Sequence, residues 1–259
     1  MKISVSQLKQ FKACRRSWWL RYMEDLEPVK KSDALTIGTN YHAKLEELYE
    51  GNYVDVTDST KETAMALAYA KYIFPDVKVK KAEEWIEKEI MPGRILHGRV
   101  DGITEDGIVV EHKTTSRDIG AEYEYNLMWD EQVLAYMYLT GTRHIIYTVC
   151  RKPTIRQKKD ETVDDFFHRM VEWYDEDTES KIRCFDVIRT DAEVNAWVHE
   201  TMEVLEQMDD CRDLEDRCYK NTLHCQSFGS ECPYKSVCLH YDADQQYVEY
   251  TRRERDYED

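Results

Sequence analysis

Two carboxylates and a lysine lie close together in residues 97–115. This segment reads as two strands around a tight turn, and Gly107 suits the left-handed residue that closes a three-residue hairpin loop. In that register Asp101 faces Glu111 across the ladder, and Lys113 projects from the same face two residues further on. A divalent cation is the natural partner of two facing carboxylates, because hard cations prefer carboxylate oxygens.

A surface hairpin with its charges in water is the simpler explanation of so short a pattern. The strand that carries Glu111 argues against it, since Ile108, Val109 and Val110 are apolar and should be buried. Buried carboxylates without partners are costly. The sequence therefore favours a metal site on this hairpin.

The composition is that of a globular protein with an acidic balance. The 259 residues suffice for one large domain or two small ones, and 18 Tyr and 6 Trp argue against disorder. The formal net charge of −16 speaks against unaided wrapping of nucleic acid, whose binding depends on neutralising phosphates. Basic clusters near 9–21 and 151–159 still allow local basic grooves.

No targeting or membrane segment is evident. The first residues lack the apolar stretch of a signal peptide, and no run is apolar enough to span a bilayer. We therefore expect a cytoplasmic protein that does not enter the membrane. Structural disulfides are rare in the cytosol, so the eight cysteines need another explanation.

Helices and strands are expected around the hairpin. Apolar residues recur at helical spacing in the stretches 3–27, 41–50, 58–74, 79–90, 122–139, 166–174 and 191–216. β-branched residues favour two further strands, at 144–150 and 184–189. Ser4 and Asp191 should cap their helices, and 28–37 reads as a linker. The charged tail after Tyr241 is expected to fray.

Two of these helices carry polar residues four positions apart on one face. They are His42 and Glu46 before the hairpin, and Gln132 and Tyr136 after it. Taken alone, both pairs are most simply polar members of amphipathic helices. The stretches 58–74 and 79–90 carry no obvious site and read as a helical insertion.

Three cysteines cluster near the end of the chain, at Cys225, Cys232 and Cys238. Zinc sites favour Cys-x-x-Cys pairs, which are missing here. An iron–sulfur cluster takes four thiolates, and Cys14 is the candidate for the fourth. Cys218 is an alternative candidate for this fourth ligand.

Taken together, these blocks resemble the RecB-like branch of the PD-(D/E)xK nuclease superfamily, which includes AddB-type and CRISPR-associated iron–sulfur exonucleases and many phage nucleases. Each block is weak alone, but they occur in the order that the family has. They are Leu8-x-x-Phe11-x-x-Cys14-Arg-Arg, Gly38-Thr-x-x-His42, Gly98-Arg-Val-Asp101, Glu111-His-Lys113, Gln132-x-x-x-Tyr136 and Cys232-Pro-Tyr-Lys-Ser-Val-Cys238.

The resemblance implies an α/β fold with a restriction-endonuclease-like core. Its central mixed β-sheet would be flanked by helices, with a C-terminal cysteine-rich iron–sulfur segment. One nuclease domain would cover 1–259. Its parts would be an N-terminal helix with a cluster cysteine at 1–27, a helical insertion at 52–92, a catalytic core at 93–150 and the cysteine-rich segment at 218–240.

The resemblance also assigns roles to residues. His42, Asp101, Glu111 and the backbone carbonyl of His112 would hold Mg²⁺ or Mn²⁺, and Lys113 would act on the attacking water and the scissile phosphate. The remaining assignments are Gln132 and Tyr136 to DNA binding, and Cys14, Cys225, Cys232 and Cys238 to a 4Fe-4S cluster.

Two positions depart from the family pattern. The spacing from Cys225 to Cys232 is longer than in the best-known members, which makes His224 and Cys218 rivals of Cys225 as cluster ligand. Val100 stands where the motif has its literal proline, a position that varies in the family.

The function implied is that of a metal-dependent DNA nuclease. We expect an exonuclease acting on DNA ends or single strands in phage or prokaryotic recombination, replication or repair. The alternatives are a non-catalytic or redox-sensing iron–sulfur DNA-binding subunit and a CRISPR-adaptation nuclease. The intact set of His42, Asp101, Glu111 and Lys113 argues against a non-catalytic subunit.

Overall fold

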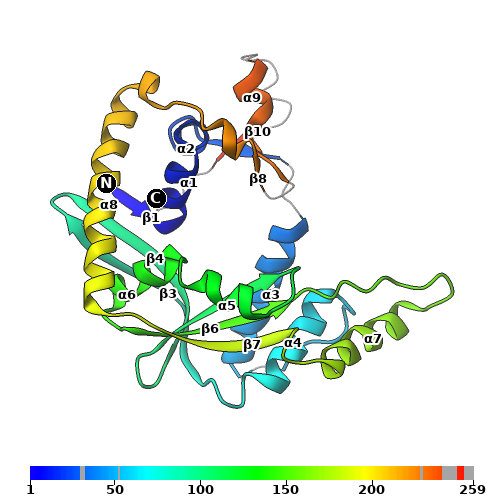
Figure 1. Cartoon of the computed structure of the whole chain (residues 1–259). Helices are drawn as coiled ribbons and strands as arrows, with labels where there is room; N and C mark the ends of the chain where they lie inside the picture. The colour runs from blue at the N-terminus through cyan, green and yellow to red at the C-terminus, as the bar shows by residue number, and fades with distance from the viewer. Residues whose placement is uncertain (30–32, 52, 228–229, 241–249, 254–259) are drawn as a thin grey trace. The chain divides into compact units, whose positions relative to one another are not determined.

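The computed structural model describes residues 1–29, 33–51, 53–227, 230–240 and 250–253 (Figure 1). The chain divides into two compact units. Unit 1 comprises Met1–Lys31, Glu87–Gly98 and Asn195–Asp259, and unit 2 comprises Ser32–Ile86 and Arg99–Val194. The single nuclease domain expected over 1–259 stays a prediction.

A mixed β-sheet forms the centre of unit 2. Its strands are β4 (Arg94–Thr104, from Arg99 on), β5 (Val109–Thr115), β6 (His144–Arg151) and β7 (Ile182–Ile188). β5 runs antiparallel to β4 and parallel to β6, and β7 is antiparallel to β6. Strand β3 (Val79–Met91) also pairs with β4.

Helices lie against both faces of this sheet. On one face, α3 (Asp33–Tyr49), α4 (Lys61–Tyr72) and α7 (Val163–Glu176) share an apolar core with Val110 and Cys150. Side chains alternate along a strand, so Glu111 and Tyr147 point to the other face.

On that second face, Tyr147 donates a hydrogen bond of 3.1 Å to Asp130, the N-cap of α6 (Glu131–Thr140). The preceding helix is α5 (Ala121–Leu127). Unit 2 is therefore an α/β fold with a mixed sheet flanked by helices, consistent with a restriction-endonuclease-like core.

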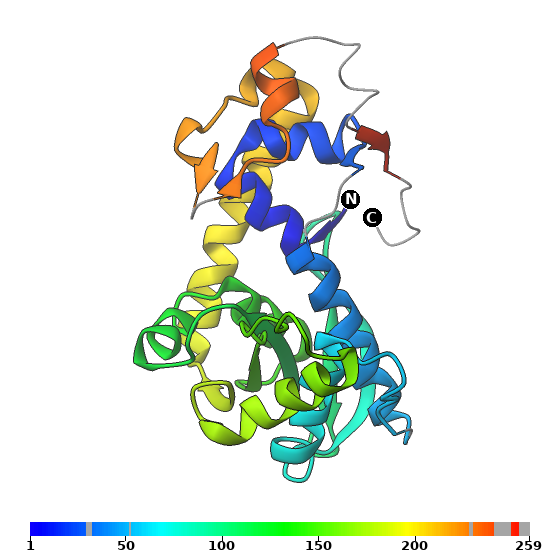
Figure 2. The ribbon, with the colours of Figure 1, turned by 90° about the vertical axis from the view of Figure 1, so that its right-hand side faces the viewer.

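Unit 1 is built from segments that are distant in sequence (Figure 2). β1 (Lys2–Ser4) runs parallel to the start of β4, with Lys2 opposite Ile95. Two helices follow, and β2 (Leu26–Pro28) pairs with β10 (Tyr250–Arg252). The C-terminal side adds the long helix α8 (Asp191–Asp213, from Asn195 on), two short 3₁₀ turns, the β8–β9 hairpin and α9 (Lys235–His240).

The predicted N-terminal helix over 3–27 is instead two helices. Ser4 caps α1 (Val5–Ala13) as expected, because its hydroxyl accepts the amide hydrogen of Gln7 at 3.2 Å. Cys14 is extended, with φ −162° and ψ 112°, so it ends α1 and precedes α2 (Arg15–Tyr22). This break, rather than a helix interior, presents the Cys14 thiol.

The helix predicted over 79–90 is wrong, because these residues form strand β3. Lys, Glu and Ala favour helix locally, but pairing with β4 overrides that preference. At Gly102 a Cβ atom would lie 2.9 Å from a methyl carbon of Val79, so a glycine permits the close approach of the two strands. The helical insertion expected at 52–92 is thus right for α4 alone.

Other boundaries also differ from expectation. Helix α3 begins at Asp33, inside the expected linker, and the helix predicted over 122–139 is divided into α5 and α6. Residues 250–252 of the tail pair with β2, while 241–249 and 254–259 lie outside the described residues. The strands at 144–150 and 184–189 and the helices α7 and α8 are confirmed within a few residues. None of the helices described here has the length and apolarity needed to cross a bilayer.

Candidate functional site

The hairpin of β4 and β5 has the predicted register. Gly102 pairs with Val110 and Ile103 with Val109, and Gly107 closes the turn with φ +78°. Continuing this register places Asp101 beside Glu111. The sequence sets this geometry locally, through the turn glycine and the buried valines.

The ladder ends where the site begins. The β4–β5 pairs stop at Gly102 and Val110, and the amide of His112, two residues after Val110, donates at 2.7 Å to Oδ2 of Asp101. A buried carboxylate thus replaces a strand carbonyl as the acceptor. Asp101 is fixed in place by the backbone and keeps its other oxygen for a partner.

That partner is His42, which arrives from α3. Its Nδ1 lies 3.3 Å from Oδ1 of Asp101. Burial alone would lower the pKa of His42, but the bond and the charge of Asp101, with the charges of Glu111 and Glu83, raise it. Burial likewise opposes ionisation of Asp101, yet His42 and the nearby cations leave the pKa of that carboxyl lowered. The two side chains therefore favour an ion pair.

Lys113 contacts both Glu111 and a residue of helix α6. Its ammonium donates to Oε1 of Glu111 and, at 2.7 Å, to the side-chain oxygen of Gln132. The Gln132 amide donates to the Tyr136 hydroxyl at 2.9 Å, and this hydroxyl donates to the carbonyl of Arg99 at 2.7 Å. The chain of hydrogen bonds therefore runs from Glu111 through both predicted helix residues back to β4.

One oxygen of Glu111 has no protein partner. Glu111 is 2% exposed, and its Oε2 is buried without a hydrogen bond. Burial raises the pKa of Glu111, and the charge of Asp101 raises it further. Buried polar atoms are normally satisfied, so this oxygen is available to a ligand. A hard divalent cation is a fitting one, because such ions take carboxylate oxygens.

The side chain of His112 is committed to the core. Its Nε2 lies 2.8 Å from the Tyr49 hydroxyl and its Nδ1 lies 2.6 Å from the Thr148 hydroxyl. Burial lowers the pKa of His112 to about 3, so the ring is neutral. Both ring nitrogens are thus occupied, and the metal role expected for the backbone carbonyl of His112 stays a prediction.

Glu83 is a site residue that the sequence did not reveal. One carboxylate oxygen of Glu83, one nitrogen of His42 and one oxygen of Asp101 all lie within 4.8 Å of one another. Among the described residues this is the group of three that could hold a single ion, and Glu111 is outside it. Glu83 was missed because 79–90 was read as a helix, whereas these residues form strand β3.

Two cavities lie beside the end of β5. The first, of about 420 Å³, is lined by His42, Glu83, Arg99 and Thr114, and we call it the site cavity. The second, of about 780 Å³, is called the aromatic cavity. Its lining includes Thr115, Arg117, Tyr123, Asn126, Trp129, Tyr147 and Arg151. Thr114 and Thr115 follow Lys113 directly, so the candidate site has open space on two sides.

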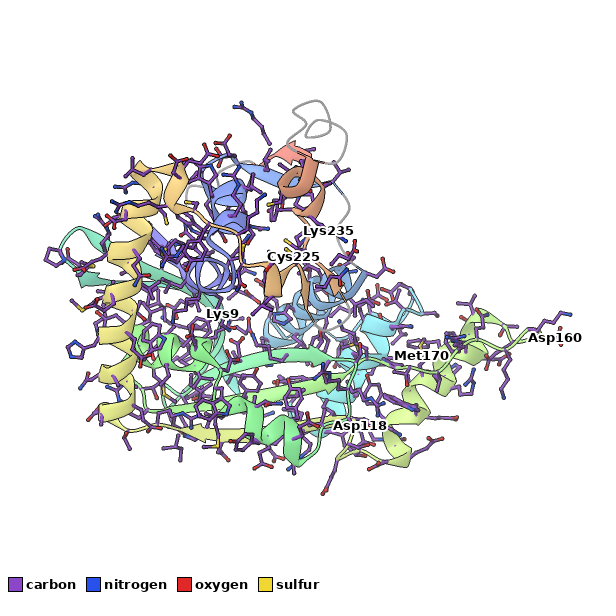
Figure 3. All side chains as sticks on the ribbon, turned by 45° about the horizontal axis from the view of Figure 1, so that its top comes forward. Lys9, Asp118, Asp160, Met170, Cys225 and Lys235 are labelled. Atoms are coloured by element: carbon purple, nitrogen blue, oxygen red, sulfur yellow. The ribbon has the colours of Figure 1, made fainter. Side chains whose placement is uncertain are left out.

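The four predicted cluster cysteines line one small cavity in unit 1. This cysteine cavity, of about 50 Å³, is lined by Cys14, Cys225, Cys232 and Cys238, with His224 and Lys235 among its other residues. Figure 3 labels Cys225 and Lys235 in this segment. The amide of Asn221 donates to the Cys14 sulfur at 3.4 Å, and the Cys232 amide donates to the Cys225 carbonyl at 3.0 Å.

The cysteines of this cavity are free thiols that influence one another. Burial raises the pKa of Cys232 and of Cys238, and the neighbouring sulfurs add to both rises. Among the described residues, no three of these sulfurs lie within 4.8 Å of one another. Of the two rivals of Cys225, His224 lines the cavity, whereas Cys218 donates to the Cys211 carbonyl at 3.4 Å.

The fold has relatives among solved structures. A candidate exonuclease from Eubacterium rectale shares 16% identity over 92% of each chain, with a TM-score of 0.54. A phage-related exonuclease from Haemophilus somnus 129PT shares 17% identity over 78% of this chain and 96% of its own, with a TM-score of 0.40. An alkaline exonuclease from Laribacter hongkongensis shares 14% over 83% and 92%, also with a TM-score of 0.40.

At such identities the first of these structures supports the α/β fold, and the two with lower scores carry no argument. A model of the PD-(D/E)XK nuclease superfamily matches residues 2–91 of the chain, which include His42 and Glu83 and end before the hairpin. The family match indicates similarity to the PD-(D/E)XK nuclease superfamily over these residues, which is the broader part of the predicted resemblance. It does not test the iron–sulfur branch. No curated protein matches the chain by sequence.

Proposed function

We propose that the chain is a metal-dependent deoxyribonuclease that acts as an exonuclease on DNA ends or single strands. The observation that carries the proposal is the buried pair of Asp101 and Glu111 beside Lys113, with Oε2 of Glu111 left without a protein partner. The match to the nuclease superfamily model supports the same conclusion.

His42, Asp101, Glu111 and the carbonyl of His112 would hold Mg²⁺ or Mn²⁺. When bound there, such an ion lowers the pKa of a water molecule and stabilises the charge that develops on the phosphate. The protein's contribution is position. Asp101 is fixed by the His112 amide, and His42 is fixed by Asp101.

Lys113 would supply a positive charge to the scissile phosphate. Burial alone would lower its pKa, but the charges of Glu111 and Asp101 raise it, so the ammonium stays charged. The DNA-side role predicted for Gln132 and Tyr136 would be indirect, because both residues help to position Lys113. Gln132 accepts a hydrogen bond from the ammonium, and Tyr136 links Gln132 to the backbone of β4.

The aromatic cavity offers a path for an unpaired strand. Trp129 lines it and is 70% exposed, and its ring lies 6.4 Å from that of Tyr125 in an edge-on pair. Exposed aromatic rings stack on nucleobases. Only an unpaired base can make this contact. This favours single strands or frayed ends as the substrate of a chain whose overall charge repels DNA.

We propose further that Cys14, Cys225, Cys232 and Cys238 hold a 4Fe-4S cluster. A single zinc ion would draw four sulfurs to about 3.8 Å from one another, given its short bonds. Four thiols that line one cavity match the four thiolates that a 4Fe-4S cluster takes. Such a cluster would be structural, because it would join α1 and α2 to the segment that ends at α9.

The nuclease proposal is tested with end-labelled single- and double-stranded DNA. Purified protein with Mg²⁺ or Mn²⁺ should release short labelled products from single strands, and a chelator should stop the reaction. Asp101→Ala, run beside it, should show no cleavage while its circular dichroism spectrum stays that of the native chain. Equal cleavage by the variant would refute the site.

The cluster proposal is tested by anaerobic purification. The protein should be brown and contain about four irons per chain. Zinc in place of iron would overturn the assignment. A non-catalytic or redox-sensing subunit would bind DNA without cutting it, and the complete set of charged residues speaks against that alternative.

A further inference from the structure

Glu83 is held in an unusual way at the mouth of the candidate site. It lies within strand β3, yet its backbone is left-handed, with φ +53°. A left-handed residue within a strand redirects its side chain, as a β-bulge does, and this backbone is unfavourable for any residue with a Cβ atom. The carboxylate that results is 10% exposed and lies beside His42 and Asp101.

Its partner in the structure is Arg99, two residues before Asp101 on β4. The guanidinium of Arg99 forms an ion pair with Glu83, and its side chain is 49% exposed. Arg99 and Glu83 both line the site cavity. One member of the pair is thus buried toward the candidate metal ligands, and the other faces the space through which a substrate would reach them.

The charges of the site are paired one to one. Asp101 has His42, Glu111 has Lys113, and Glu83 has Arg99. A divalent cation bound by His42, Asp101 and Glu111 would add positive charge next to Glu83. The carboxylate of Glu83 lies within 4.8 Å of ligand atoms of His42 and Asp101, so it is close enough to be attracted by that ion.

We propose that Glu83 is a further metal-side carboxylate of this site and that Arg99 is its exchange partner. Without an ion, Glu83 binds Arg99. With an ion, Glu83 turns to the ion or to its bound water, and Arg99 becomes available to a phosphate of the DNA backbone. A guanidinium suits that task because its fork of donors matches phosphate oxygens. This inference rests on the proposed nuclease function and extends its ligand set.

The first test measures Mn²⁺ binding to the full chain, purified with its cluster, by titration calorimetry without DNA. Glu83→Gln should weaken Mn²⁺ binding by about tenfold or more. The matched control is Glu84→Gln, which removes the same charge at the next position of β3, where Glu84 pairs with Lys81 at 2.5 Å. It should leave the affinity within about twofold.

Asp101→Ala serves as the reference that separates the two proposals. If Asp101→Ala abolishes Mn²⁺ binding and Glu83→Gln does not change it, the role of Glu83 is wrong and the proposed active site stands. If neither variant changes Mn²⁺ binding, the proposed metal site itself fails. A loss in both variants, with the control unchanged, supports both.

The second test measures exchange. The affinity for a phosphorothioate single-stranded oligonucleotide, which resists cleavage, is measured by fluorescence anisotropy with and without Mn²⁺. Arg99→Gln should lose about tenfold in affinity with Mn²⁺, the value of one charged hydrogen-bonded contact, and almost nothing without it. An equal loss in both conditions, or no loss in either, would show that Arg99 does not exchange partners.

Discussion

The carboxylate site of unit 2 and the cysteine cavity of unit 1 are built in opposite ways. The carboxylates sit on neighbouring strands whose register is fixed by buried valines, and each has a cation within the protein. The cysteines come from a helix break and from short turns near the end of the chain, and burial together with neighbouring thiols raises the pKa of Cys232 and of Cys238. The charges of the first site are paired within the protein, whereas the second, with the proposed cluster, would gain part of its order from the ligand.

This difference predicts different consequences of losing each ligand. Metal ligation contributes folding energy where no preformed site exists. Removing the divalent ion from unit 2 should therefore stop the reaction and leave the fold unchanged. Removing the proposed cluster from the cysteines should lower the stability of unit 1 and only then reduce activity.

The largest expected effect is that of Asp101→Asn. Asparagine keeps an oxygen that can accept the His112 amide but loses the charge, so the fold should persist and the metal should not bind. We expect cleavage of single-stranded DNA to fall by about a thousandfold, as when a charge-stabilising group is removed from an active site. Iron content and Tm should stay those of the native chain. Activity within tenfold of native would contradict the assignment.

Next in size is the effect of Cys14→Ser on unit 1. We expect iron to fall from about four per chain to below about one, because a serine hydroxyl is a poor substitute for a thiolate. The Tm should fall with it, while Mn²⁺ affinity stays native as long as the chain is folded.

The matched control is Cys218→Ser. This thiol is also buried in unit 1, but it bonds to the Cys211 carbonyl and does not line the cysteine cavity. Its iron content should be native. Iron lost in Cys218→Ser and kept in Cys14→Ser would reverse the ligand assignment, and a loss of Mn²⁺ binding in folded Cys14→Ser would break the contrast between the two regions.

The same contrast governs what could be predicted from the sequence. The register that places Asp101 beside Glu111 depends on a turn glycine and three neighbouring apolar residues, so local rules sufficed. His42 and the four cysteines lie far apart in the chain. Their convergence was expected from resemblance alone, because no local pattern brings distant segments together.

Glu83 shows why the rest could not be predicted. Residues 79–90 are rich in Lys, Glu and Ala, which favour helix when considered alone. Their strand conformation comes from pairing with β4, a contact made possible by Gly102. The break between α5 and α6 did have a local signal, since Asp130 is a good N-cap residue. That signal was hidden by the continuous apolar spacing around it.

A smaller effect is expected at the aromatic cavity. Trp129→Ala should raise the KM for single-stranded DNA by about tenfold to a hundredfold, because stacking on one base is worth about 1–3 kcal/mol, and should leave kcat close to native. Tyr53→Ala is the control, since Tyr53 is highly exposed and does not line this cavity. A fall in kcat with unchanged KM would mean that Trp129 supports Lys113 rather than DNA.

The smallest change, Gly102→Ala, asks how far the carboxylate site depends on the fit of β3 to β4. The added methyl would meet Val79 at 2.9 Å, and valine has little freedom to move aside. We expect a loss of about 1–3 kcal/mol in stability, seen as a fall in Tm of about 3–10 °C. Mn²⁺ affinity should fall a few-fold, because Glu83 and Asp101 lie on the two strands that are pushed apart, while iron content stays native.

Adding Val79→Ala should restore most of the lost stability and of the lost Mn²⁺ affinity. Gly120→Ala, where a Cβ atom would meet nothing within 4 Å, should change neither. If Gly102→Ala lowered the iron content as well, the two regions would not be independent in the way their construction implies.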